Sequence, residues 1–212
     1  MSAACACRPA LRLLVLWDID HTLIETRGVG RAIYQRAFPA ATGKPLATLA
    51  SISGRTELDI MAESLRLGDI EPTEEMATRL ARSPAVYQSV LTGNLRDVAR
   101  IKLEVFDLDR YLDLDAGAYG DDDPERPKLV AIAQRRAAER TGVMFDDDAT
   151  VLIGDTPQDV DAGLASGVRV IGVATGKTSA QELRNVGAHH VATNLVECQA
   201  ILNRLTQDIR NA

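Results

Sequence analysis

A doubly wound α/β fold, with a Rossmann-like parallel-sheet core and a small helical cap domain inserted into it, is predicted by two features of the sequence. Short apolar runs rich in Val, Ile and Leu alternate with longer helical patterns, as they do in chains that build a parallel sheet covered by helices. Between residues 25 and 86 this alternation stops, and helical patterns follow one another between turns that contain Gly and Pro. We therefore expect a core domain of residues 1–24 and 87–212 and a cap domain of residues 25–86.

The strands of the core are expected where short apolar runs stop at polar or turn-forming residues, at 12–17, 87–91, 114–118, 149–153 and 168–173. Its helices are expected where apolar residues recur with helical spacing, at 95–106, 128–140 and 157–165. Pro157 and Asp159 suit the first turn of the last helix, because Pro loses no hydrogen bond there and an acid interacts favourably with the helix dipole. Gly167 is expected to end this helix.

The composition excludes several classes of protein. The chain has 212 residues and a net charge of -6, so it lacks the excess of Lys and Arg on which non-specific nucleic-acid binding depends. No run approaches the roughly 18 apolar residues that span a membrane, and the apolar run that follows Arg8 and Arg12 is too short for a signal peptide. Three cysteines cannot form a disulfide framework. We therefore expect a cytoplasmic enzyme or binding protein.

Polar residues follow the expected strands in an informative pattern. They are Asp18, Asp20 and Thr22 after the first strand, Thr92, Gly93 and Asn94 after the second, and Asp155, Thr156 and Asp159 after the fourth. Ligands of open parallel sheets bind at the carboxyl ends of the strands, so we expect these groups to share one crevice with a cation at position 126 or 128. Clustered carboxylates repel one another, and an all-oxygen set of ligands favours Mg²⁺ when the substrate carries phosphate.

Four motifs in this order resemble those of the haloacid dehalogenase superfamily of phosphohydrolases. They are DIDHTL at 18–23, LTGN at 91–94, a basic residue at 126–128 and GDTPQD at 154–159, and together they span nearly the whole chain. The resemblance is to members with a helical cap, of the phosphoglycolate phosphatase-like and phosphoglucomutase-like kind. It implies a Mg²⁺-dependent phosphatase that acts on a small phosphorylated metabolite.

The resemblance also implies a role for each motif residue. Asp18 would attack phosphorus and form an aspartyl-phosphate, and Asp20 would protonate the leaving oxygen and then deprotonate the hydrolytic water. Thr92 and the Gly93 amide would hold a phosphoryl oxygen beside Asn94. The Mg²⁺ ligands would be Asp18, the Asp20 carbonyl group and Asp155, with Asp159 orienting the metal shell or the basic residue.

Three questions about the site have two interpretations each. Either Arg126 or Lys128 can be the cation that neutralises the transferring phosphoryl group, because Arg126-Pro127 resembles the usual pair while Lys128 has the better spacing to the next strand. His21 stands where the superfamily commonly has Gly, and it either points away from the phosphate or contacts the substrate. Arg55 in the cap either contacts a distal group of the substrate or is a surface residue.

Other functions remain open at this stage. A sugar phosphomutase uses the same motifs, and a phospho-accepting receiver module has a similar acidic pocket but lacks the helical insertion and the segment from Asp155 to Asp159. The segment GVATGKT at 172–178 is one residue short of a nucleotide-binding loop, so we interpret it as a turn after a strand. His189 and His190 are interpreted as surface or structural residues. The sequence does not indicate the oligomeric state.

Overall fold

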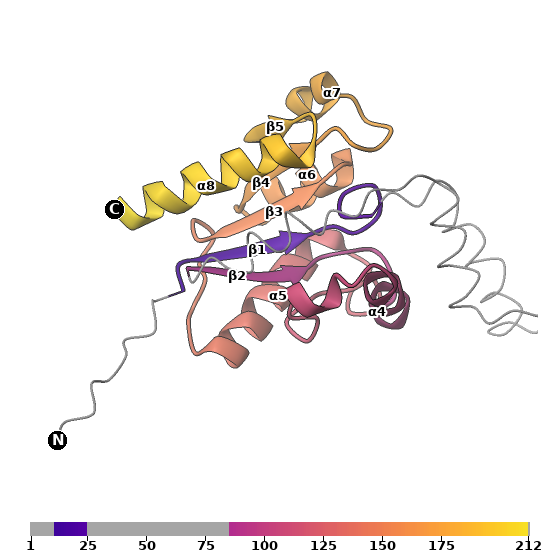
Figure 1. The fold of residues 1–212 in the computed structure, drawn as a ribbon, viewed down its shortest axis with the longest axis vertical. Coiled ribbons are helices and arrows are strands. Elements are labelled where there is room, and N and C mark those ends of the chain that lie inside the picture. The colour runs from indigo at the N-terminus through magenta and orange to yellow at the C-terminus, as the bar shows by residue number, and fades with distance from the viewer. Residues whose placement is uncertain (1–10, 25–84, 212) are drawn as a thin grey trace, which may run out of the picture.

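The computed structural model describes residues 11–24 and 85–211 (Figure 1). The expected cap of residues 25–86 therefore lies outside the described residues, apart from its last two positions. Val86 is already the first residue of a strand, so the sheet starts one residue before the expected domain boundary. Within the described segments, no helix is both long and apolar enough to cross a membrane.

Five parallel strands form a single sheet in the order β2-β1-β3-β4-β5. They are β1 (Leu13–Trp17), β2 (Val86–Val90), β3 (Thr150–Gly154), β4 (Arg169–Val173) and β5 (His190–Ala192). The chain passes from β1 to β2 on one side and then returns to β3 on the other side of β1. This reversal of strand order is the switch point at which doubly wound sheets bind ligands. The predicted doubly wound α/β core is confirmed, and the inserted helical cap stays a prediction because it lies outside the described residues.

Helices cover both faces of the sheet (Figure 1). They are α4 (Arg96–Val105), α5 (Arg126–Thr141), α6 (Pro157–Ala165), α7 (Ala180–Asn185) and α8 (Leu195–Asn211), with a short 3-10 helix η1 (Asp109–Tyr111). The alternation of side chains along β1 divides the core: Leu13, Val15 and Trp17 belong to the apolar cluster that includes residues of α4 and α8. Leu14 and Leu16 belong to the cluster on the other face, which includes residues of α5 and α6.

Local sequence signals explain where α6 begins and ends. Thr156 is its N-cap: the Thr156 side chain accepts a hydrogen bond from the Asp159 amide, and the Asp159 side chain accepts one from the Thr156 amide. Pro157 is the first helical residue, and Gly167 follows the helix with a left-handed φ of 76°. The predicted bounds of this helix are confirmed, and each is set by a residue type that suits its position.

The prediction of a strand at 114–118 is wrong. Its backbone forms successive turns, because the Ala116 amide donates to Asp113 O (3.2 Å) and the Gly117 amide to Leu114 O (3.3 Å). Only an isolated bridge joins Ala118 to Leu91. The segment nevertheless lies along β2, where the Asp113 amide donates to Gln88 O (2.9 Å) and the Ala118 amide to Val90 O (3.0 Å). The apolar pattern thus reflects burial beside the sheet and not an extended strand.

The fifth strand is β5, which begins at His190 and has only three residues. Its shortness explains why the apolar pattern did not reveal it, since three residues are too few to show an alternation. His189 Nδ1 accepts a hydrogen bond from the Val170 amide (3.1 Å), so this histidine has a structural contact with β4. The other four strands lie within one residue of their predicted bounds.

Close packing of α6 on β4 leads to a first prediction, for Gly163→Ala. Ala is usually favoured over Gly inside a helix by about 1 kcal/mol. Here a Cβ on Gly163 would lie 2.2 Å from Val170 Cγ2, and Val170 is fully buried. We expect the substitution to lower the free energy of unfolding by about 1–3 kcal/mol, measured by urea denaturation. Val170→Ala should remove the clash, so the double variant should be less destabilised than the sum of the two single effects predicts. Destabilisation equal to that sum would contradict this interpretation.

Candidate active site

The carboxyl ends of β1 and of its two neighbours in the sheet, β2 and β3, lie level with one another. Trp17 of β1 is in register with Val90 of β2 and with Ile153 of β3, and the Asp18 amide donates to Ile153 O (2.8 Å). A crevice of about 260 Å³ opens at this edge, lined by Asp18, Asp20, His21, Thr92, Gly93, Asn94, Arg126, Asp155, Thr156 and Asp159. The expectation that these groups share one crevice therefore agrees with their positions in the structure.

Three buried carboxylates form the deepest part of the crevice. One oxygen from each of Asp18, Asp155 and Asp159 lies within 4.8 Å of the others, which makes this group able to hold a metal ion. The Thr22 hydroxyl lies between two of them, 3.5 Å from Asp18 Oδ2 and 3.3 Å from Asp155 Oδ1. Since all of these donor atoms are oxygens, the set suits a hard divalent cation.

Burial makes the charged forms of Asp18 and Asp155 unfavourable. It raises the pKa of Asp18 well above its ordinary value, and the neighbouring Asp159 carboxylate adds to the rise while Arg126 opposes it. Burial, followed by Asp159, also raises the pKa of Asp155. The protein therefore needs positive charge at this position to keep the carboxylates ionised.

Arg126 supplies one positive charge. Its Nη2 lies 2.8 Å from Asp18 Oδ1 and also pairs with Asp159 Oδ1, whereas its Nε is buried without an acceptor among the described residues. Gly93 makes room for the guanidinium group, since a Cβ there would lie 3.1 Å from Nη1. Lys128 lies outside the crevice: its side chain is 54% exposed and pairs with Glu125 (2.7 Å).

Asp159 is engaged through both of its carboxylate oxygens. Oδ1 pairs with Arg126, and Oδ2 accepts hydrogen bonds from the Thr156 amide (3.1 Å) and hydroxyl (2.5 Å). A carboxylate held in this way is better placed to orient the guanidinium group and the start of α6 than to bind a metal directly. Of the two roles expected for Asp159, orienting the metal shell or orienting the basic residue, the geometry favours the second.

The turn after β2 presents hydrogen-bond donors to the crevice. The Thr92 hydroxyl oxygen accepts from the Asn94 amide (3.2 Å) and from Asn94 Nδ2 (2.8 Å), so its proton is left to donate. Within the described residues, the Thr92 hydroxyl and the Gly93 amide have no acceptor. Together with Arg126 they offer donors to an anionic group that enters the crevice.

Asp20 has a partner that the sequence motifs do not include. Lys102 Nζ lies 2.6 Å from Asp20 Oδ1 and 2.8 Å from Oδ2, and its side chain is only 3% exposed. Lys102 sits on the buried face of α4 with Ala99 and Leu103. The signal in the sequence is a lysine that stands among the apolar positions of an amphipathic helix, where a charged residue is unusual.

His21 adopts a left-handed backbone conformation, with φ at 60°. This explains why Gly is common at the position, because Gly reaches positive φ without steric cost, whereas His is tolerated there. The His21 carbonyl accepts a hydrogen bond from the Thr175 hydroxyl, and His21 lines the crevice. Arg55 lies outside the described residues.

The loop at 174–177, which follows β4, packs against one of the carboxylates of the crevice. A Cβ on Gly176 would lie only 1.9 Å from Asp155 Oδ2, so the backbone of this loop packs directly against the carboxylate. The GVATGKT segment is thus a turn after a strand, as expected, and its second glycine has a packing reason that does not involve a nucleotide.

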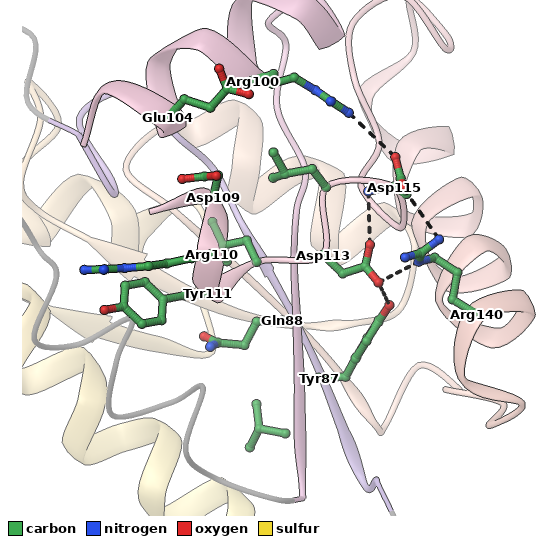
Figure 2. A pocket seen from close by; sticks show the side chains of 13 residues that line it. Tyr87, Gln88, Arg100, Glu104, Asp109, Arg110, Tyr111, Asp113, Asp115 and Arg140 are labelled. Carbon is green, nitrogen blue, oxygen red and sulfur yellow. Dashed lines mark hydrogen bonds and ion pairs between the residues drawn. The ribbon is translucent and has the colours of Figure 1, made fainter. Parts of the chain in front are cut away.

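A larger cavity, of about 610 Å³, lies at the amino end of β2, the end opposite to the crevice (Figure 2). Its charged groups compensate one another: Asp113 accepts from the Tyr87 hydroxyl (2.5 Å) and from Arg140 Nε (2.5 Å). Asp115 pairs with Arg100 and with Arg140 (Figure 2). Burial, followed by Asp113, raises the pKa of Tyr87. These contacts favour a structural role for the cavity lining over a reactive one.

Comparisons with known proteins agree with the geometry. Residues 125–198 match a family model described as HAD-hydrolase-like. The chain is 24% identical, over 182 residues, to a candidate pyrophosphatase, PpaX, of Caldanaerobacter subterraneus subsp. tengcongensis. The aligned region covers 75% of this chain and 80% of that protein. It is similar in fold to a predicted phosphatase of Clostridium acetobutylicum (20% identity, TM-score 0.62, 92% of this chain and 100% of that chain). It is also similar in fold to a HAD family hydrolase of Deinococcus radiodurans with bound phosphate and sodium (20% identity, TM-score 0.56). That match covers 92% of this chain and 96% of that chain.

The contact of Gly176 with Asp155 leads to a second prediction. Gly176→Ala must displace either the loop or the carboxylate, so we expect the affinity for Mn²⁺, measured by isothermal titration calorimetry, to fall by about 10-fold. Lys177→Ala changes the same loop without placing an atom against Asp155, and it should bind Mn²⁺ as the wild type does. Equal affinities in all three proteins would show that Asp155 does not bind the metal in this position.

Proposed function

Because this chain belongs to the haloacid dehalogenase superfamily of hydrolases, we propose that it is a Mg²⁺-dependent phosphatase that hydrolyses a small phosphomonoester through an aspartyl-phosphate. The resemblance seen in the four motifs is confirmed at the level of the superfamily. One observation carries the proposal: the Asp18 carboxylate stands beside three donors, the Thr92 hydroxyl, the Gly93 amide and Arg126, in one small crevice. A nucleophile next to convergent donors suits attack on a phosphoryl group.

The charge of the crevice supports a divalent cation. Three ionised carboxylates, those of Asp18, Asp155 and Asp159, and one guanidinium group, that of Arg126, leave a charge of about -2 if all are ionised, as hard-cation sites require. Asp18, Asp155 and the Asp20 carbonyl group would hold Mg²⁺, and Asp159 would orient Arg126. The cation, when bound, would supply charge neutralisation to the phosphoryl oxygens.

The residues of the chain divide the reaction into two steps. Asp18 attacks phosphorus while the bond from phosphorus to the leaving oxygen breaks, and Asp20 gives its proton to that oxygen. In the second step Asp20 takes a proton from a water molecule, which attacks phosphorus and frees Asp18 as inorganic phosphate forms. Arg126, Thr92 and the Gly93 amide hold the phosphoryl oxygens in both steps.

The small crevice handles only the phosphoryl group, so these residues support a substrate class and not one substrate. The candidate pyrophosphatase, the predicted phosphatase and the hydrolase with bound phosphate are all named for phosphate chemistry or hold phosphate, which supports the same class. We propose that the substrate is a small phosphorylated metabolite. The choice among metabolites would depend on groups outside this crevice, with Arg55 as our candidate.

The direct test is steady-state hydrolysis of 4-nitrophenyl phosphate by the full chain. We expect activity that requires Mg²⁺ and is abolished by EDTA, and we expect Asp18→Asn to lower kcat by at least about 10³-fold because the nucleophile is lost. Activity that survives both changes would refute the mechanism. Transfer to an added sugar phosphate in preference to water would identify a mutase, and a long-lived aspartyl-phosphate without turnover would identify a receiver-like module.

A further prediction separates the two candidate cations. Arg126→Ala removes the group that contacts Asp18, so kcat/KM for the same substrate should fall by about 100-fold or more. Lys128→Ala is the matched control, because Lys128 is exposed and its partners among the described residues, Asp123 and Glu125, do not line the crevice; its kcat/KM should stay within about twofold of the wild type. A reversed order of the two effects would show that Lys128 is the active-site cation.

A further inference from the structure

Lys102 is a buried cation at the edge of the crevice, and the catalytic scheme above does not use it. Burial of an ammonium group costs free energy unless the charge is paired and its N–H groups are hydrogen-bonded. Here the pairing crosses between elements that are far apart in sequence, since Lys102 belongs to α4 and Asp20 follows β1. Because this buried lysine contacts the proposed acid-base residue directly, we consider what it contributes to the reaction.

The contacts of Lys102 form a closed network. Its ammonium group has three donors, and three oxygens accept: Asp20 Oδ1 (2.6 Å), Asp20 Oδ2 (2.8 Å) and Asn94 Oδ1 (2.9 Å). Asn94 donates through Nδ2 to Asp20 Oδ2 (2.7 Å) and to Thr92 Oγ1 (2.8 Å). The network therefore joins the proposed acid-base residue to the threonine that faces the phosphoryl group.

We propose that Lys102 is a positioning residue that, with Asn94, holds the Asp20 carboxyl group in the orientation needed for both proton transfers. This inference rests on the proposed phosphatase function. Lys102 does not line the crevice, so it acts through Asp20 and does not contact the substrate. Asp20 itself remains accessible, since a third (33%) of its side chain is exposed.

The network also distinguishes the two oxygens of Asp20. Oδ2 accepts from both Lys102 and Asn94, whereas the one donor to Oδ1 among the described residues is Lys102. Each carboxylate oxygen has two lone pairs, so Oδ1 keeps one for the proton that passes to the leaving oxygen. Lys102 and Asn94 then hold Asp20 through Oδ2 while Oδ1 gives up its proton and, in the second step, accepts one from water.

The test compares Lys102→Met with the wild type on two substrates. Phenyl phosphate has a poor leaving group that needs protonation, whereas 2,4-dinitrophenyl phosphate has a good one that does not. We expect Lys102→Met to lower kcat for phenyl phosphate by about 100-fold, with KM changed less than about threefold, and to lower kcat for 2,4-dinitrophenyl phosphate much less. Lys102→Arg keeps the positive charge, so its kcat for phenyl phosphate should be at least about 10-fold higher than that of Lys102→Met.

A double-mutant cycle tests whether Lys102 acts through Asp20. In an Asp20→Asn background, adding Lys102→Met should change kcat for phenyl phosphate by less than about threefold, because the group that Lys102 positions is already lost. Lys128→Met, which removes an exposed lysine, should leave kcat unchanged on both substrates. Thermal unfolding of each variant gives the folded fraction, to which every rate is normalised.

Three results would overturn this inference. They are an equal loss of kcat on both substrates, full additivity of Lys102→Met with Asp20→Asn, and a folded Lys102→Arg variant that is no more active than Lys102→Met. If Lys102→Met does not fold, Lys102→Arg takes its place and is compared in the wild-type and Asp20→Asn backgrounds. Full additivity of its effect with Asp20→Asn would again overturn the inference. A folded wild-type protein that hydrolyses neither phosphate with Mg²⁺ would instead refute the proposed function, and this inference with it.

Discussion

Electrostatic crowding at the carboxyl ends of β1 and β3 is the constraint on which the site depends. Parallel pairing in register brings Asp18 and Asp155 to the same level, and the first turn of α6 adds Asp159. Carboxylates this close repel one another by about 4 kcal/mol per pair at an effective dielectric constant near 20. Arg126 relieves part of this repulsion, and the arrangement is one that a divalent cation and an anionic substrate can complete together.

The chain uses two separate cations for its two kinds of acid. Arg126 contacts Asp18 and Asp159, whereas Lys102 and Asn94 contact Asp20. This separation lets the proposed nucleophile remain in a strongly charged environment while the acid-base residue belongs to a compensated, hydrogen-bonded network. The division of labour proposed for Asp18 and Asp20 therefore has a structural basis in their surroundings.

Much of the architecture could be predicted because it follows from local signals. Four strands, the start of α6 and the shared crevice follow from apolar runs, from Thr156-Pro157 and from polar residues at strand ends. The segment 114–118 could not be assigned correctly, since an apolar run beside a sheet looks the same whether it is extended or folded into turns.

The choice between Arg126 and Lys128 could have been made from the phase of α5. Its buried residues Leu129 and Val130 are three and four positions after 126, so Arg126 shares their face, whereas Lys128 points about 200° away around the helix. The contact between Lys102 and Asp20 could not be predicted in this way. It joins segments more than 80 positions apart, and only the packing of α4 against the sheet brings them together.

The turns at 113–118 have a consequence for how this molecule meets its neighbours in solution. They pair with two outer carbonyl groups of β2, those of Gln88 and Val90, at one edge of the sheet, while β5 at the other edge is only three residues long. Unpaired strand edges recruit strands from other chains, which leads to domain swapping and aggregation. Among the described residues, one edge strand is partly covered by the chain itself and the other is short, so these edges offer little template for pairing with a strand of another chain.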